Sequence, residues 1–109
     1  MLNAFREGKP RVLVLSLPHG DAVDSVIDQI APLLNRGDVV VDCGNEFWEV
    51  TERRQKKMAD EKGVAWLGVG VSGGYQAARR GPSMSAGGDK EAFDKVRRRV
   101  CAAETATRR

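Results

Sequence analysis

The stretch from Val64 to Gly88, VAWLGVGVSGGYQAARRGPSMSAGG, decides how the rest of the chain is interpreted. A short apolar run passes into GVSGG at residues 70–74. Glycines can adopt positive φ angles and let a ligand approach the backbone, while a serine hydroxyl and exposed amides can donate hydrogen bonds to an anion. We therefore predict a buried strand that ends in a ligand-binding loop.

Residues 68–73, GVGVSG, also match the dinucleotide-binding pattern G-x-G-x-x-G. A true fingerprint opens the first βαβ unit, leads into a long helix and is followed about twenty residues later by an acidic residue. Here the match follows the third predicted strand, Gly81-Pro82 interrupts what comes next, and Asp89 lies at a helix start. The residues leave three interpretations open: a dinucleotide fingerprint, a loop for another anion, or a structural turn.

Composition is typical of a soluble globular protein. The chain has 109 residues, of which 41% are hydrophobic and 30% charged, so one domain is expected. No apolar run approaches the about 20 residues that span a bilayer, so we expect no membrane partner. The first residues lack the features of a secretory signal, which predicts a cytoplasmic protein.

Cysteine spacing and the distribution of charge argue against a metal-binding or nucleic-acid-binding protein. Cys43 and Cys101 match no metal-ligand spacing, so we expect reduced thiols and no metal site. The net charge of +3 is concentrated in the arginine-rich residues 97–109. We interpret them as a solvated tail and expect no nucleic-acid partner, because no aromatic residues are interleaved with the arginines; nucleic-acid binding through the tail is the alternative.

Apolar runs alternate with helical periodicity along the chain. We predict strands at residues 11–17, 39–41, 65–69 and, weakly, 83–86. We predict helices from an Asp21 N-cap to a stop at Gly37, over residues 48–62 before Gly63, over 76–80, and from an Asp89 cap to about Val100. This alternation indicates an α/β fold: a parallel sheet of about four strands with helices on both faces.

Ligands bind at the carboxyl ends of the strands in such sheets. The first three predicted strands end in LPHG at 17–20, GN at 44–45 and SGG at 72–74. We expect these segments to meet at one rim. Asn45 could bind a ligand or cap the next helix, and His19 could act as a base, contact a phosphate or simply be exposed.

Other candidates have plain structural alternatives. Cys43 could be a weak nucleophile, although a small buried residue is preferred. Arg79 and Arg80 could clamp a phosphate or lie at the surface. Phe47 and Trp48 are interpreted as packing a helix against the sheet, with base stacking as the alternative.

Several short motifs recur in an order and spacing that resemble one family. They are AVD at 22–24, DCGN at 42–45, Thr51 with Arg53 and Arg54, VSGG at 71–74, Ala78-Arg79, GPS at 81–83 and GG at 87–88. From Lys9 to Val96 the sequence resembles the coenzyme-binding domain of 6-phosphogluconate dehydrogenase. The resemblance implies the later half of that family's Rossmann-like domain, in a divergent and truncated form.

The activity that this resemblance implies is an oxidoreductase reaction of gluconate utilisation and the pentose phosphate pathway. NADP-dependent oxidative decarboxylation converts 6-phosphogluconate to ribulose 5-phosphate and carbon dioxide. The resemblance places coenzyme contacts at Leu17, Pro18, His19 and Asn45. It places substrate contacts at Asn45, Ser72, Gly73 and Gly74.

The chain departs from the family at several positions. Pro18 replaces a usual lysine, Cys43 replaces a usual glycine, and residues 46–48 and 75–76 also differ. The resemblance implies that the family's dinucleotide fingerprint precedes Met1 and that its catalytic lysine and glutamate lie beyond the last residue. No catalytic residue is therefore assigned within this chain.

We accordingly expect a partial domain over residues 9–100, a basic and disordered tail over 101–109, and no turnover by the isolated chain. The first strand would pair with a strand outside this sequence, which leaves an apolar edge available for homo-oligomer formation. The alternative function is a non-catalytic anion-binding or interaction module derived from the same fold.

Overall fold

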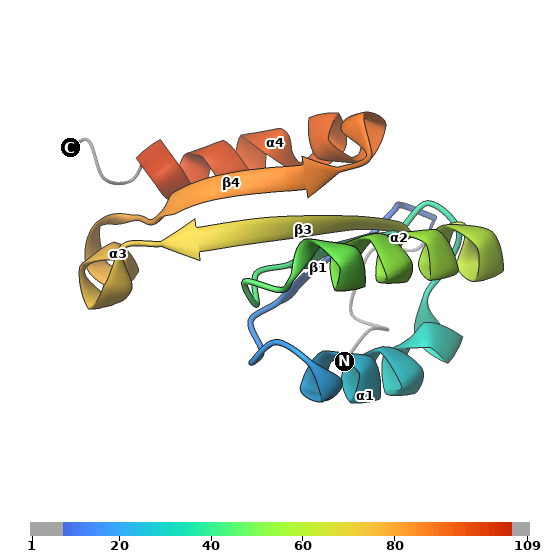
Figure 1. The fold of residues 1–109 in the computed structure, drawn as a ribbon. Coiled ribbons are helices and arrows are strands. Elements are labelled where there is room, and N and C mark those ends of the chain that lie inside the picture. Colours follow the sequence, from blue (N-terminus) through green and yellow to red (C-terminus); the bar gives the residue numbers. More distant parts are fainter. Residues whose placement is uncertain (1–7, 106–109) are drawn as a thin grey trace.

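The structure, a computed structural model, describes residues 8–105, with side chains as far as residue 98. Its centre is a four-stranded sheet in the order β1-β2-β3-β4 (Figure 1). The strands are β1 (Val12–Leu15), β2 (Val39–Asp42), β3 (Ala65–Ser72) and β4 (Ser83–Gly88). The α/β class and the four strands are as predicted.

The fourth strand corrects one prediction, because β4 runs antiparallel to β3 while β1, β2 and β3 are parallel. The connection between β3 and β4 holds only the short helix α3 (Gly74–Arg80), which lies beyond the end of β3. So short a connection returns the chain as a hairpin and does not cross to the opposite end of the sheet. Pairing with β4 also extends β3 to Ser72, three residues past the predicted end.

Helices cover both faces of the sheet, as expected. On one face lie α1 (Asp21–Ile30), followed by a 3₁₀ turn η2 (Ala31–Leu33), and α2 (Trp48–Lys62). On the other face lies α4 (Lys90–Thr105), seen beside β4 in Figure 1. Residues such as Val40, Met58 and Trp66 form the core on the α1–α2 face. Val41, Leu67 and Val96 belong to the core on the α4 face.

The ends of the helices agree with the sequence signals only in part. Gly63 ends α2 in a left-handed conformation with φ 64°, and Asp89 caps α4 by accepting a 2.7 Å hydrogen bond from the Ala92 amide. Asp21, however, is the first residue of α1, and Gly20 occupies its N-cap position without a side-chain cap. Helix α1 also ends at Ile30, well before Gly37, because Pro32 lacks the amide hydrogen that a continuing helix needs.

Helix α4 continues to Thr105, beyond the end predicted near Val100. Residues 106–109 of the predicted tail lie outside the described residues. The division into a domain at 9–100 and a disordered tail therefore stays a prediction.

Close packing of α2 on the sheet depends on Gly68. A Cβ atom at this position would lie 2.6 Å from Thr51 Cγ2 of α2. Only a glycine lets the helix approach β3 this closely, and this approach brings the start of α2 next to the carboxyl ends of the strands.

Candidate functional site

The loops after β1, β2 and β3 meet at one rim of the sheet, as the sequence predicts. A Cβ atom on Gly44 would lie 2.8 Å from the carbonyl oxygen of Leu17, so the first two loops are in close backbone contact. Gly20 donates its amide hydrogen to Glu46 Oε2 at 2.7 Å. Asn45 then contacts Val71 of β3. The three segments chosen from the sequence are therefore neighbours.

Asn45 joins the second loop to the third strand. It has a left-handed φ of 55°, which asparagine tolerates better than most residues. Its Oδ1 accepts the Val71 amide hydrogen at 2.7 Å, and its Nδ2 donates to the Val71 carbonyl at 3.1 Å. Phe47, not Asn45, is the N-cap residue of α2. Each polar atom of the Asn45 carboxamide keeps one bonding position for a ligand, namely a lone pair on Oδ1 and a hydrogen on Nδ2.

Glu46 is the anion that links the first two loops. Its Oε2 accepts hydrogen bonds from Gly20 N–H and, at 2.8 Å, from Arg54 Nη1, while its Oε1 accepts the Phe47 amide hydrogen at 2.9 Å. Burial raises the pKa of the Glu46 carboxyl, but these hydrogen bonds and the nearby Arg54 charge outweigh burial and hold the pKa below its usual value. Glu46 is therefore ionised at neutral pH.

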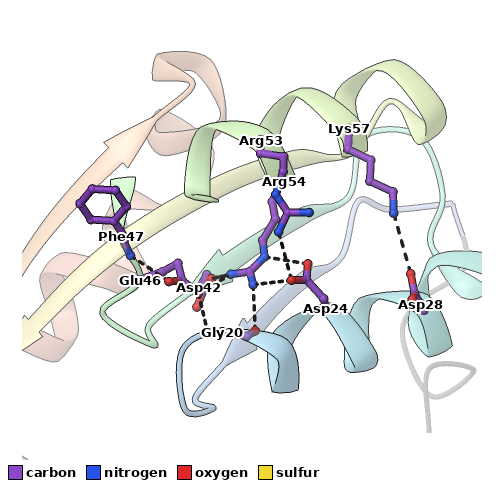
Figure 2. Close-up of polar contacts among 9 residues, drawn as sticks. All are labelled: Gly20, Asp24, Asp28, Asp42, Glu46, Phe47, Arg53, Arg54 and Lys57. Atoms are coloured by element: carbon purple, nitrogen blue, oxygen red, sulfur yellow. Dashed lines mark hydrogen bonds and ion pairs between the residues drawn. The ribbon is translucent and has the colours of Figure 1, made fainter. Parts of the chain in front are cut away.

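Arg54 lies in the middle of α2 with a side chain only 2% exposed. Its Nη2 donates to the Gly20 carbonyl at 2.9 Å and to Asp24 Oδ2 at 3.0 Å, and its Nε donates to Asp24 Oδ1 at 3.1 Å (Figure 2). Asp42 Oδ2, which accepts no hydrogen bond from the described residues, lies 3.5 Å from Arg54 Nη1. We call Arg54 with Gly20, Asp24, Asp42 and Glu46 the Arg54 cluster.

Burial lowers the pKa of Arg54, but its carboxylate partners outweigh burial and raise it overall. The pKa of the Asp24 carboxyl is lowered, and hydrogen bonding from Arg54 is the largest cause. The sequence placed Arg54 only within a motif of the resembled family, and it assigned neither Arg54 nor Glu46 a role in the site. One signal was present: Arg54 lies four residues before the buried Met58, which puts both on the face of α2 that packs inward.

The third loop is shaped by glycine backbone. Ser72 is the exposed last residue of β3, and Gly73 has a φ of 125°, which side chains on L residues rarely allow. A Cβ atom on Gly73 would lie 2.7 Å from Ala77 Cβ. Gly74, with φ 54°, begins α3, a helix without buried residues. The loop thus presents the Ser72 hydroxyl at an exposed turn.

The GVGVSG match at 68–73 is not a dinucleotide turn. Gly68 and Gly70 lie within β3 and pair with Gly87 and Ser85 of β4. A dinucleotide fingerprint needs these glycines in the turn between a strand and a long helix, and α3 has only seven residues. Two of the three interpretations of the loop remain: a binding loop for another anion and a structural turn.

For most of the remaining candidate residues, the structure favours the structural interpretation over the functional one. Pro18 and His19 are exposed, and His19 makes no side-chain hydrogen bond to the described residues. Cys43 is half-buried against the α4-side core, and burial, together with the Asp42 charge, raises the pKa of its thiol. A raised pKa disfavours the thiolate, so Cys43 has the properties of a small packed residue. Arg79 and Arg80 are exposed on α3.

Phe47 and Trp48 correct another prediction. Both side chains are exposed, with ring centroids 6.0 Å apart, and do not pack α2 against the sheet. They lie at the start of α2, past the carboxyl end of β2. Trp48 instead borders a groove of about 420 Å³ between α2 and the β3–β4 pair. Asn45 also lines this groove, so the groove adjoins the rim.

The described residues hold no group of three or more histidine, cysteine, aspartate or glutamate residues that could bind a metal. None of the helices over residues 8–105 is long and apolar enough to cross a membrane. A mostly parallel α/β sheet with polar loops at the carboxyl ends of its strands defines a Rossmann-like domain of the nucleotide-binding class.

Comparison with known families specifies this class further. The family model described as the NAD binding domain of 6-phosphogluconate dehydrogenase matches residues 2–105. The chain belongs to this family. A decarboxylating 6-phosphogluconate dehydrogenase of Emericella nidulans is 54% identical over 92 residues, which cover 83% of this chain and 18% of the relative. An NAD(+)-dependent decarboxylating enzyme of Bacillus subtilis is 48% identical over 88 residues, covering 81% of this chain and 19% of that enzyme.

Solved structures agree with this assignment. Plasmodium falciparum 6-phosphogluconate dehydrogenase, solved in its apo form, with NADP+ and with 6-phosphogluconate, matches with a TM-score of 0.83 and 38% identity. The match covers 94% of this chain and 21% of the Plasmodium chain. A Mycobacterium tuberculosis 3-hydroxyisobutyrate dehydrogenase shares the fold, with a TM-score of 0.73 at 21% identity, covering 82% of this chain and 31% of that one. The chain thus spans about a fifth of the length of its 6-phosphogluconate dehydrogenase relatives.

Proposed function

We propose that this domain supplies substrate and coenzyme contacts for NADP-dependent oxidative decarboxylation of 6-phosphogluconate. The observation that carries the proposal is the pair of hydrogen bonds between Asn45 and Val71, which joins the loop after β2 to the end of β3, where the third loop begins. The family resemblance assigns ligand contacts to both loops. Membership in the 6-phosphogluconate dehydrogenase family supports the same reaction.

The proposed substrate contacts are Asn45, Ser72, Gly73 and Gly74. 6-Phosphogluconate carries hydroxyl groups, a carboxylate and a phosphate. The Asn45 carboxamide can both donate to and accept from a hydroxyl group, and its orientation is held by Val71. The Ser72 hydroxyl and the backbone amides of a glycine loop are suited to an anionic group. A composite site of this kind would hold the hydroxyl-bearing carbon chain between two strand ends.

The proposed coenzyme contacts are Leu17, Pro18, His19 and Asn45. We assign them to the coenzyme because the family resemblance places its contacts there, and because the loop at 17–19 is partly exposed and lies against the backbone of Gly44, next to Asn45. NADP, when bound, accepts the hydride. The choice of NADP over NAD follows the sequence resemblance and the NADP+ complex of the Plasmodium relative, whereas the Bacillus subtilis relative is NAD(+)-dependent.

We expect the chain by itself to bind ligand without turning it over. Among the described residues of the three strand-end loops there is no lysine, and the one acid within these loops, Glu46, is held by three hydrogen bonds. We further propose that the protein acts in the pentose phosphate pathway and in the cytoplasm.

A second candidate is a non-catalytic anion-binding or interaction module. Val14 of β1 is 65% exposed, and within the described residues β1 pairs only with β2. An apolar, unpaired strand edge favours association, so this candidate includes a homo-oligomer formed through β1.

NMR titration of the ¹⁵N-labelled chain separates the two candidates. We expect 6-phosphogluconate to shift the amide signals of Ser72, Gly73 and Gly74 and the side-chain amide of Asn45 in a saturable way. Gluconate, which lacks the phosphate, is the control and should bind more weakly. Size-exclusion chromatography of the same sample reports association. Concentration-dependent association without shifts at these residues would favour the module.

A further inference from the structure

We propose that Arg54 is a positioning residue that sets the geometry between the coenzyme-contacting loop at 17–20 and the substrate-contacting Asn45. The inference rests on the proposed function for the roles of these two loops. Its basis is the Arg54 cluster, in which one buried guanidinium contacts segments from β1–α1, α1 and the loop after β2 (Figure 2).

Gly20, the residue after His19, is held at both of its backbone polar groups. Its amide hydrogen is donated to Glu46 Oε2 at 2.7 Å, and its carbonyl accepts a hydrogen bond from Arg54 Nη2 at 2.9 Å. Glu46 Oε2 in turn accepts from Arg54 Nη1 at 2.8 Å. Gly20, Glu46 and Arg54 thus form a closed ring of three contacts. This ring limits movement of His19 relative to Asn45, because each is bonded directly to a ring member.

The effect reaches the third loop through Asn45. Glu46, the residue after Asn45, is held by Arg54. The Asn45 carboxamide in turn bonds both backbone polar groups of Val71. Val71 directly precedes Ser72. A continuous series of hydrogen bonds and covalent bonds therefore links Arg54 to the proposed substrate loop.

Stability alone does not explain a buried charge at this position. Replacing buried ion pairs by apolar residues of similar volume is often neutral or stabilising. What a guanidinium adds is a planar, rigid set of donors that binds several acceptors at fixed angles. Here Nε, Nη1 and Nη2 all donate hydrogen bonds, to two carboxylates and one carbonyl. A lysine ammonium carries its donors on a single atom and cannot span these acceptors.

Arg53 offers a matched control. It also binds Asp24 Oδ2, at 3.1 Å, and it lies next to Arg54 in α2. Its side chain is 59% exposed, and it contacts neither Gly20 nor Glu46. Arg53→Lys and Arg54→Lys therefore make the same chemical change on the same helix, but only Arg54→Lys alters the ring.

The test compares the full wild-type chain with these two variants by ¹⁵N NMR, well below each unfolding midpoint. In Arg54→Lys we expect the Gly20 amide and the Asn45 side-chain amide to shift in the free protein. We expect its affinity for 6-phosphogluconate to fall about tenfold, as for loss of one charge-assisted hydrogen bond. In Arg53→Lys the same signals should stay in place and affinity should change less than about twofold.

A folded Arg54→Lys variant with wild-type Gly20 and Asn45 signals and wild-type affinity would overturn the inference. If the wild-type chain does not bind 6-phosphogluconate at all, the proposed function fails, and the signals of the free protein still decide whether Arg54 positions the two loops. If Arg54→Lys does not fold, Glu46→Gln replaces it, since a glutamine side chain cannot accept at both terminal atoms. If that variant also unfolds, the cluster simply holds the domain together and the positioning role is rejected.

Discussion

Two regions of the molecule hold the proposed site by different means. The frame, which comprises β1, α1, β2 and α2, fixes its strand-end loops with buried side-chain charges centred on Arg54. The arm, residues 70–85, comprises the end of β3, α3 and the start of β4, and none of its residues is buried. In Figure 1, α3 lies beyond the end of the sheet, away from α1 and α2. The frame is shaped by side chains, whereas the arm is shaped by glycine backbone.

The two halves of the site should therefore be sensitive to different kinds of substitution. Substitutions in the frame remove partners from buried charges and should change the stability of the whole domain. Substitutions in the arm change local backbone geometry and should act mainly on ligand binding. Hydrogen bonds between Asn45 and Val71 join the two regions.

The largest effect is expected from Arg54→Met. Removing the guanidinium leaves the buried carboxylates of Asp42 and Glu46 without their cation, which typically costs about 3–5 kcal/mol of unfolding free energy. The matched variant Arg53→Met removes an exposed ion pair and should cost less than about 1 kcal/mol. Urea denaturation measures both values. Equal losses for the two variants would remove the distinction between the frame and the surface.

Gly73→Ala should weaken ligand binding more than it lowers the stability of the domain. At φ 125° an alanine is strained by about 1–3 kcal/mol, and its Cβ would lie 2.7 Å from Ala77 Cβ, so the loop must move. We expect weaker binding of 6-phosphogluconate in calorimetry, by about tenfold or more. Gly70→Ala is the control, because its φ is not positive and its Cβ meets nothing nearer than 3.8 Å. Gly73→Ala with unchanged affinity would show that the arm does not contact the ligand.

Acid should weaken the frame through Glu46 and Asp24. Their pKa values are lowered in the folded protein from usual values of 4.5 and 3.8, so their stabilising effect is present above these values. It is lost as pH falls from there through the folded-state pKa values. Melting temperatures between pH 7 and 3 should fall less steeply in Arg54→Met. Burial raises the pKa of the Asp38 carboxyl, but Arg11 and Asn35 outweigh burial and lower the pKa overall. Asp38 should therefore contribute to acid sensitivity equally in the wild type and in Arg54→Met.

The smallest effect is expected for Cys43→Ala. Its thiol is half-buried and has a raised pKa, so no reactive thiolate is lost. We expect less than about 1 kcal/mol of destabilisation and an affinity for 6-phosphogluconate within about twofold of wild type. A larger loss of binding would assign Cys43 a direct role in the site.

The sequence predicted those features that local chemistry determines. Helix α2 and its end at Gly63, the Asp89 cap and the buried run at 39–41 each follow from signals a few residues long. Convergence of the three strand ends follows from the geometry of parallel strands. The antiparallel direction of β4 follows from the short connection after β3, a signal that the alternation of strands and helices obscured. The burial of Arg54 depends instead on contacts with distant segments. Periodicity could place Arg54 on the inward face of α2, but not show that Asp24, Asp42 and Glu46 surround it.

Calorimetric titration of 6-phosphogluconate into the wild-type chain and into Asn45→Asp tests the proposed substrate site most directly. Aspartate keeps the shape and tolerates the left-handed φ, but it cannot donate to the Val71 carbonyl and it brings a charge that repels the anionic ligand. We predict saturable binding by the wild type and no measurable binding by Asn45→Asp under the same conditions. Equal affinities, or no binding by the wild type, would contradict a substrate site centred on Asn45.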